Sequence, residues 1–450
     1  MRHLATHDIG IAAAAHTRYA QGAYDRANSE VSMRLGQSEI DPLLPDLPEG
    51  APPSSVLILN IWPNVDCGRY PIKRELGDEV QVWADVFRDG HDAIGAHLDW
   101  WPAETIDIRE APFAFEDNDR WTGRFRPDAI GRWEYQIMAY PDPITSKRIE
   151  IIKKFDAAVD ISLELKEFDL LLGQVVDIYP AARSVVADLR DRVGQRKTNA
   201  EKVAIITGLD AIADLRPFRN LGGEQRSDVY SLTVDRVRAR FAAWYSMFPR
   251  SSGTVEGKSA TFKDVEARLP AIAELGFDVL YFTPIHPIGS TNKKGKNNSL
   301  RSTPEDPGSP YAIGSAFGGH DAVEPTLGTI DDFDHLVAEA ATHNMEIALD
   351  VALQGSPDHP WAKEHPDFFT VRPDGSIKFA ENPPKKYEDI YPLSFDTAAW
   401  QKLWFELERV ITFWIDHGVR SFRVDNPHTK PTIFWEWLIT RIHRTHPEVI

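Results

Sequence analysis

A short segment near the end of the chain places a basic and an acidic residue at a spacing that could do chemistry. The sequence GVRSFRVDNPHTKP, residues 418–431, begins as an apolar strand and ends in a polar, proline-containing stretch. Because side chains alternate along a strand, Arg423 and Asp425 share one face, and Asp425 comes last. The neighbouring cation favours the ionised carboxylate and lowers its pKa. An anionic carboxylate aimed into a pocket suits attack on the anomeric carbon of a sugar. The alternative is a purely structural ion pair.

Two further segments gather cationic and amide side chains. They are Lys293, Lys294, Lys296, Asn297 and Asn298 in the first segment, and Lys385, Lys386 and Tyr387 in the second. A reaction that releases phosphate needs cationic and hydrogen-bonding partners for the leaving group, whereas hydrolysis of a neutral glucan does not. The alternative is a pair of solvated basic loops. Because the first segment follows a predicted strand in a chain of net charge −18, we interpret it as a phosphate-binding loop.

Histidines near residue 360 raise the question of a metal ion. Asp358, His359 and His365 could supply ligands, but each histidine precedes a proline in a predicted loop. We therefore expect no metal and no cofactor, and we interpret these residues as orienting the loop or lining a sugar subsite. His428 stands three residues after Asp425, and the sequence assigns it no role.

Composition limits the classes of partner. Of the 450 residues, 42% are hydrophobic and 26% are charged, and the net charge is −18. Such an acidic chain lacks the basic face of a general nucleic-acid binder. No apolar run approaches the roughly 20 residues of a membrane span. Cys67 is the single cysteine, which excludes an intramolecular disulfide and fits a reducing compartment. We therefore expect a cytoplasmic protein with no nucleic-acid and no membrane partner.

The elements that must position Asp425 alternate between strand and helix after residue 239. Strands are predicted at 241–248, 277–284, 345–353 and 419–425. Between them lie helical patterns, one of which begins at Thr329 with Asp332 three residues later, as in a capping box. This alternation predicts a parallel sheet with right-handed crossovers, in the form of a (β/α)8 TIM barrel. Two connections of about 45 residues follow predicted strand ends, and loops of that length are usually functional.

The residues before this barrel differ in character. Residues 1–53 have little periodicity and end in a proline-rich stretch, so we expect a disordered extension. Residues 54–145 show short alternating runs that predict a β-sandwich. Residues 146–238 contain long amphipathic stretches that predict a helical insert or linker. The expected fold class is multidomain: an N-terminal β-sandwich with a helical insert, then the first half of a (β/α)8 TIM barrel over residues 239–450.

Several blocks of sequence resemble, in order, those of a known family. They are CGRYPIKRELGDEV, AWYSMFPRS, LGFDVLYFTPIHPIG, KKGKNNSL, DPGSPYAIGS, GGHDAVEPTLGT, EIALDVALQGSPDHPW, RPDGSIKFAENPPKKYEDIYP and FRVDNPHTKP. The resemblance covers residues 56–450 and is to the GlgE-type maltose-1-phosphate maltosyltransferases of the α-amylase superfamily, glycoside hydrolase family 13. It implies a retaining transferase that moves maltosyl units from α-maltose 1-phosphate to the non-reducing end of α-1,4-glucans, releases phosphate and forms a homodimer.

The same resemblance implies roles for individual residues. Asp425 matches the nucleophile, which forms a β-maltosyl ester, and Arg423 is its charged neighbour. The matches to donor-binding positions are Lys294, Gln354, Asn382, Tyr387, Asp389 and Asn426. Two positions depart from the family pattern: Lys293 stands where arginine is more common, and Gly355 where cysteine is usual.

A retaining mechanism needs a second carboxyl group about 5–5.5 Å from the nucleophile. The resemblance places that glutamate beyond Ile450, so we expect a C-terminally truncated and inactive chain whose parent is the enzyme. Two alternatives stay open. One is an amylase-like hydrolase or transglycosylase that uses no phosphate, and the other is a non-catalytic glucan-binding or dimerisation fragment built on the β-sandwich.

Overall fold

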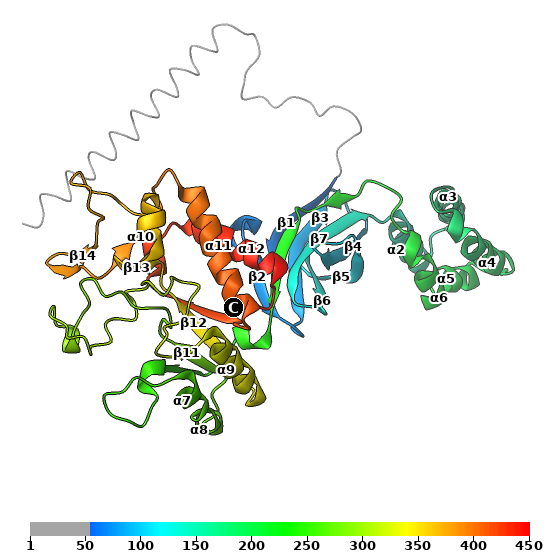
Figure 1. Ribbon diagram of the computed structural model, residues 1–450. Helices are drawn as coiled ribbons and strands as arrows, with labels where there is room; N and C mark the ends of the chain where they lie inside the picture. The colour runs from blue at the N-terminus through cyan, green and yellow to red at the C-terminus, as the bar shows by residue number, and fades with distance from the viewer. Residues whose placement is uncertain (1–54) are drawn as a thin grey trace, which may run out of the picture. The chain divides into compact units, whose positions relative to one another are not determined.

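The computed structural model describes residues 55–450 (Figure 1). The expected disordered extension, residues 1–53, lies outside these residues. Within residues 55–450, every helix is too short or too polar to cross a bilayer.

An N-terminal sheet begins the described chain. Its strands are β1 (Val56–Trp62), β2 (Ile72–Glu75), β3 (Val80–Arg88), β4 (Ile94–Pro102), β5 (Arg109–Asp117), β6 (Arg120–Phe125), β7 (Gly131–Pro141), β8 (Gln225–Arg226) and β9 (Tyr230–Asp235). Their order across the sheet is β1-β3-β6-β5-β4-β7-β9-β2, with β8 paired to β7. Neighbouring strands are antiparallel except for β2 and β9, which run parallel.

Strand β5 joins the two halves of this sheet. Residues 109–112 pair with β4, and residues 113–117 pair with β6. Both halves face one core, since Val82 of β3, Leu98 of β4 and Tyr135 of β7 are fully buried in the same cluster. The N-terminal sheet domain expected from the sequence is therefore confirmed, with its two halves joined through β5, and a division into two packed sheets stays a prediction. β3, and β7 over most of its length, bury every second residue, which is the pattern that predicted these strands.

A group of helices follows β7 (Figure 1): α2 (Pro143–Asp156), α3 (Ser162–Ile178), α4 (Arg183–Gly194), α5 (Asn199–Ile206) and α6 (Leu209–Leu215). These helices bury a core of their own, which includes Ile151, Phe168 and Leu189. The chain then returns to the N-terminal sheet as β8 and β9. Residues 146–238 are therefore not helical throughout, because their last part supplies strands too short to show a clear alternation in the sequence.

A second sheet carries the candidate site. Its strands are β10 (Trp244–Met247), β11 (Val279–Phe282), β12 (Glu346–Val351) and β17 (Ser421–Val424), in that order and all parallel. The helices of this part are α7 (Phe262–Glu266), α8 (Leu269–Glu274), α9 (Ile330–Thr342), α10 (Pro360–Glu364), α11 (Trp400–Asp416) and α12 (Thr432–Thr445). Each predicted strand is present with shorter limits, and the arrangement is a partial barrel.

Local sequence signals set the limits of these helices. Thr329 and Asp332 form the predicted capping box at the start of α9. Gly418 follows α11 with φ 85°, a left-handed conformation that glycine adopts without strain, and so it ends the helix just before β17. The helical stretch after Thr261 is divided into α7 and α8, because Pro270 cannot donate a backbone hydrogen bond and stands at the start of the second helix.

Two long connections leave the carboxyl ends of β11 and β12. The first contains a short 3-10 turn, η6 (Lys296–Asn298). The second contains α10 and two small strand pairs, β13 (Gln354–Gly355) with β16 (Tyr391–Pro392), and β14 (Ala380–Asn382) with β15 (Lys385–Tyr387). Because parallel strands present their carboxyl ends at one edge, both connections start beside the end of β17.

Candidate active site

Asp425 is the first residue after β17, at the carboxyl end of the parallel sheet. Its backbone N–H donates to the carbonyl oxygen of Val351 at 3.0 Å, so it extends the pairing of β17 with β12. Asn426 then adopts a left-handed conformation, φ 48°, and Pro427 begins the 3-10 helix η8 (Pro427–Thr429). The backbone of Asp425 is therefore fixed by the sheet on one side and by a sharp turn on the other.

Arg423 and Asn426 hold the carboxylate of Asp425. Nη1 of Arg423 donates to Oδ1 at 2.7 Å, and Nδ2 of Asn426 donates to Oδ2 at 3.0 Å. The two bonds fix the orientation of both carboxylate oxygens. The Asp425 side chain is 19% exposed, so it is largely shielded from solvent and still accessible. The pair expected from strand alternation is thus present, with Asn426 as an added donor.

Asp350 anchors Arg423 from the neighbouring strand β12. The two residues are register partners, and Nη1 of Arg423 lies 3.2 Å from Oδ1 and 3.1 Å from Oδ2 of Asp350. Tyr281 and Tyr311 donate their hydroxyl groups to Oδ2 at 2.5 and 3.0 Å. The Asp350 side chain has no exposed surface (0%), and burial raises its pKa against the effect of these donors. Asp350 is not among the residues predicted from the sequence, although it and Glu346 are the two acids in the otherwise apolar strand 345–353, and an acid in such a strand is a signal.

The groups around Asp350 keep fixed protonation states. Burial, and next the hydrogen bond to Asp350, raises the pKa of Tyr281 well above its usual range. Burial and the charge of Asp350 raise the pKa of Tyr311 to about 12. Burial by itself would lower the pKa of Arg423, but the hydrogen bond with Asp425 and the charge of Asp350 raise it. Both tyrosines therefore stay donors near neutral pH, and Arg423 stays a cation between two carboxylates.

Lys294 and Asp389, expected as separate donor-binding residues, face each other. Nζ of Lys294 lies 3.8 Å from Oδ1 of Asp389, and the two side chains are 7% and 3% exposed. This distance is longer than a hydrogen bond. Oδ1 of Asp389 accepts no hydrogen bond from any residue in the described part of the chain. Burial raises the pKa of Asp389. The pair brings the two long connections together, and Oδ1 of Asp389 can still accept a hydrogen bond.

Asp358 ties the same two connections together. Its Oδ2 accepts from the backbone N–H groups of Ser290 and Thr291, both at 2.7 Å, and from the Ser290 hydroxyl at 3.0 Å. Its Oδ1 accepts from the Thr291 hydroxyl at 2.7 Å. Burial opposes ionisation, but these bonds hold the pKa of Asp358 below its usual value. Asn292 adds a bond from Nδ2 to the carbonyl oxygen of Glu388 at 3.1 Å, so the lysine-rich segment is attached to the loop that carries Asp389.

Buried imidazoles form a hydrogen-bonded chain below these loops. Nδ1 of His359 accepts from the backbone N–H of Trp361 at 3.0 Å, so its Nε2 carries the proton. That nitrogen donates to Nδ1 of His320 at 3.0 Å, and Nε2 of His320 donates to the carbonyl oxygen of Ala352 at 2.9 Å. Burial lowers the pKa of His359 to about 2 and that of the adjacent His286 to about 3. His359 therefore orients the loop as a neutral group, one of the two roles expected for it.

The remaining predicted residues are spread around this group. Nε2 of Gln354 donates to the carbonyl oxygen of Tyr311 at 3.2 Å, which connects it to the Asp350 cluster. Asn382 and Tyr387 lie on the β14–β15 hairpin, where Asn382 is exposed and Tyr387 is half-buried. Within residues 55–450, no hydrogen bond or ion pair joins Asn382 or Tyr387 to Asp425. The structure thus assembles a carboxylate held by a cation, with polar loops around it.

Comparisons with known proteins agree on one family. A family model described as "Alpha-1,4-glucan:maltose-1-phosphate maltosyltransferase, domain N/S" matches residues 54–236. Similar curated proteins bear the name α-1,4-glucan:maltose-1-phosphate maltosyltransferase. The relative from Myxococcus xanthus is 46% identical over 406 residues, which are 88% of this chain and 61% of the relative. The relative from Rhodospirillum rubrum is 46% identical over 428 residues, which are 91% of this chain and 62% of the relative. A relative from Streptomyces coelicolor is 45% identical over 408 residues, which are 87% of this chain and 59% of the relative.

Solved structures include partial matches. An α-amylase from Lactobacillus plantarum is 30% identical, with a TM-score of 0.39, over 46% of this chain and 44% of that chain. A noncanonic maltogenic α-amylase from Thermotoga neapolitana is 25% identical, with a TM-score of 0.38 and the same coverages of 46% and 44%. The chain spans about three fifths of the length of the curated relatives it matches, at 61%, 62% and 59%.

Proposed function

Because the chain belongs to the family of α-1,4-glucan:maltose-1-phosphate maltosyltransferases, we propose that the parent enzyme of this chain transfers maltosyl units from α-maltose 1-phosphate to the non-reducing end of α-1,4-glucans and releases phosphate. The observation that carries the proposal is Asp425, whose two oxygens are held by Arg423 and Asn426 at the end of β17. A nucleophile oriented before the substrate arrives lowers the entropic cost of attack.

In the proposed mechanism, a carboxylate oxygen of Asp425 attacks C1 of the donor from the face opposite the phosphate. The bond from C1 to the phosphate oxygen breaks, its electron pair leaves with the phosphate, and a β-maltosyl ester of Asp425 forms. The 4-hydroxyl group at the non-reducing end of the glucan then attacks C1, Asp425 leaves as a carboxylate, and a base takes the hydroxyl proton. Two inversions at C1 give net retention. Arg423 stabilises the carboxylate when it is released.

Asp350 is the second carboxyl group of this cluster, and we assign it a positioning role. It is shielded from solvent and accepts hydrogen bonds from Tyr281, Tyr311 and Arg423. A general acid or base must come within hydrogen-bond distance of the reacting oxygen. The contacts of Asp350 keep its carboxylate buried and occupied, so it does not meet this requirement. Asp350 is therefore not the acid/base of the proposed reaction.

We assign recognition of the phosphate to Lys294. Its ammonium group is too far from Asp389 for a hydrogen bond, at 3.8 Å, so its N–H groups are available to a phosphate oxygen. In such a buried place a charge-assisted bond is stronger than it is in water. Gln354, Asn382, Tyr387 and Asp389 complete the proposed set of donor contacts.

The proposal also extends to the fold and the domain limits. We infer that the parallel strands β10, β11, β12 and β17 are the first half of a (β/α)8 barrel, with domain limits near residues 54–145, 146–238 and 239–450. The helices α2–α6 would then be an insert in the N-terminal sheet domain. A homodimer and a cytoplasmic location stay predictions of the sequence.

The decisive experiment traps the ester. Incubation of the chain with α-maltosyl fluoride, whose fluoride leaves with little need of a general acid, should add one maltosyl group to Asp425, as read by intact and peptide mass spectrometry. Asp425→Asn should stay unlabelled. Labelling of wild type and variant alike, or of another carboxylate, would overturn the assignment.

Binding and phosphate release separate the open alternatives. Calorimetry should show tighter binding of α-maltose 1-phosphate than of maltose, and phosphate release that depends on a glucan acceptor identifies transfer. Redistribution of maltohexaose without any phosphate donor would favour the amylase-like alternative. A folded chain that binds glucan and is never labelled would favour the non-catalytic one.

A further inference from the structure

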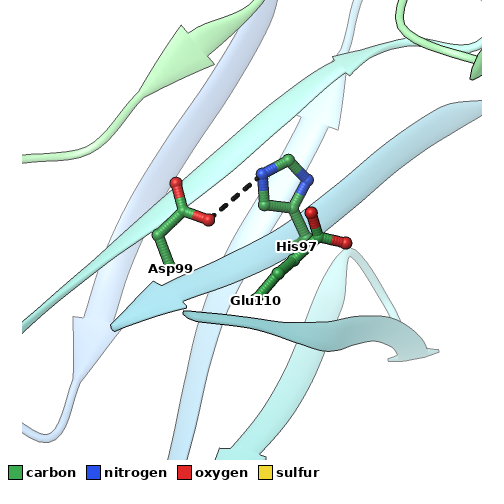
Figure 2. Close-up of side chains that lie close together, drawn as sticks. All are labelled: His97, Asp99 and Glu110. Atoms are coloured by element: carbon green, nitrogen blue, oxygen red, sulfur yellow. Dashed lines mark ion pairs between the residues drawn. The ribbon is translucent and has the colours of Figure 1, made fainter. Parts of the chain in front are cut away.

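His97, Asp99 and Glu110 gather on one face of the N-terminal sheet (Figure 2). His97 and Asp99 are two residues apart on β4, and Glu110 on β5 is the register partner of Asp99. Leu98 between them is fully buried in the sheet core, so the three polar side chains lie on the opposite face. Each offers one ligand atom, and these atoms lie within 4.8 Å of one another. We propose that the three residues bind a divalent cation, with zinc as the preferred ion.

The distance between His97 and Asp99 fits two ligands of one ion. Nε2 of His97 lies 3.3 Å from Oδ1 of Asp99. A charge-assisted hydrogen bond between such groups is usually about 2.7–2.9 Å long. Two ligand atoms bound to tetrahedral zinc at about 2.0–2.1 Å stand about 3.3–3.4 Å apart. The observed separation is therefore long for a hydrogen bond and close to the spacing across a zinc ion.

The three side chains have few competing partners. In the part of the chain that the structure describes, neither ring nitrogen of His97 takes part in a hydrogen bond, and Glu110 forms no ion pair. Asp99 has one other ionic neighbour, Arg226, whose Nη1 lies 3.5 Å from Oδ2. Oδ1 of Asp99 is thereby left facing the imidazole. Asp99 and Glu110 place two carboxylates beside one guanidinium, which Glu224 also binds at 3.3 Å, so negative charge predominates there and a divalent cation compensates it.

The donor set selects the kind of ion. An imidazole nitrogen with carboxylate oxygens suits zinc, whereas magnesium prefers an octahedral shell of oxygen atoms. The side chains of His97 and Asp99 are 14% and 10% exposed, and Glu110 is exposed. An ion would therefore enter from the side of Glu110 and keep water as a further ligand.

The position of this site gives it a structural consequence. Its ligands come from β4 and from the part of β5 that pairs with β4, and β5 is the strand that joins the two halves of the N-terminal sheet. Zinc bound there would cross-link the two strands at the point where the two halves meet. The free energy of binding would add to the stability of the folded sheet.

Zinc chloride titrated into the metal-free chain tests the proposal by calorimetry. One zinc per chain is expected, and His97→Ala and Glu110→Gln should each weaken binding by more than about tenfold. The matched control is His335→Ala, which removes a histidine already paired with Glu266 at 2.7 Å and should leave zinc affinity unchanged. Magnesium in excess should not displace the zinc.

Cobalt supplies a second readout, because Co2+ in a site of low coordination number absorbs visible light strongly and Co2+ in water does so weakly. The absorption should be present in the wild-type chain and absent in Glu110→Gln. This substitution changes an exposed side chain, so the loss of binding would not arise from misfolding. A chain that takes up no zinc at submillimolar concentration, or His97→Ala binding zinc as the wild type does, would overturn the proposal.

Discussion

Asp350 and Arg423 are register partners on adjacent parallel strands, and the guanidinium group of Arg423 connects two carboxylates. Its Nη1 lies 3.1 Å from Oδ2 of Asp350 and 2.7 Å from Oδ1 of Asp425. Asp350 is itself held by the hydroxyl groups of Tyr281 and Tyr311. The orientation of the candidate nucleophile is therefore set by contacts that begin in the buried sheet.

In the parent enzyme expected from the sequence, Arg423→Lys should lower turnover by about a hundredfold, because a small misplacement of the nucleophile that Arg423 positions has that effect. A lysine ammonium cannot reproduce the fixed fork of a guanidinium between two carboxylates. The measurement is kcat for maltosyl transfer, with thermal unfolding recorded beside it. The control is Arg441→Lys, in an ion pair with Glu408 away from the cluster. Equal turnover in both variants would contradict the positioning role of Arg423.

In the same parent enzyme, Asp425→Ala should abolish transfer and leave the fold intact. Loss of a covalent nucleophile typically lowers the rate by several orders of magnitude, so less than about a hundredth of the wild-type turnover should remain. The exposed Asp416→Ala, at the end of α11, is the matched control and should stay active. Circular dichroism and urea unfolding check that Asp425→Ala is folded. Turnover above that hundredth in a folded variant would rule out a nucleophilic role.

Lys294→Met should weaken the binding of α-maltose 1-phosphate far more than the binding of maltose, since it removes the cation assigned to the phosphate. It should also lower the free energy of unfolding by about 3–5 kcal/mol, because Asp389 is left buried without its partner. The double variant Lys294→Met/Asp389→Asn separates the two effects. It should recover much of the stability and none of the preference for the phosphorylated sugar. Equal losses for the two ligands would show that Lys294 does not recognise phosphate.

The stability of the chain should fall as the pH drops below about 6.5. Burial lowers the pKa of His286 to about 3 and of His359 to about 2, so both stay neutral in the folded chain. In the unfolded chain they bind protons at a pKa of about 6.5. The unfolded state then holds more protons, and the free energy of unfolding decreases with falling pH from that value toward about 3. Each histidine contributes a slope that approaches about 1.4 kcal/mol of unfolding free energy per pH unit.

Urea unfolding between about pH 7 and 5 measures this slope while most carboxylates remain ionised. In His359→Gln the chain should take up one proton fewer on unfolding, so the free energy of unfolding should change less steeply with pH. His91→Gln, at an exposed position, serves as the control. A slope that is the same in wild type and His359→Gln would contradict the neutral state of this imidazole.

Short-range patterns predicted the parts of the site that lie within one element. Alternation along a strand was enough to place Arg423 and Asp425 together, and the Thr329–Asp332 spacing predicted the cap of α9. Asp350 is 73 positions from Arg423 in the sequence, and their contact depends on strand register. No local pattern encodes register between distant strands. The same holds for Lys294 and Asp389, whose pairing depends on two loops meeting.

The N-terminal sheet shows a similar limit. Alternating burial predicted strands that cover one core, but it does not show that β5 bonds to β4 at one end and to β6 at the other. Likewise β8, with only Gln225 and Arg226, is too short to show periodicity before its pairing with β7 is known.

The helices α2–α6 leave the N-terminal sheet and rejoin it at the same strand. β7 ends at Pro141, Asp142 caps α2, and the returning β8 pairs with Met138 and Ala139 of β7. An excursion whose two ends are held together at its base can change in length without displacing the strands, and the entropic cost of a longer loop grows only slowly. Evolution or a protein engineer can therefore shorten, enlarge or exchange this helical module while the N-terminal sheet keeps its strand order.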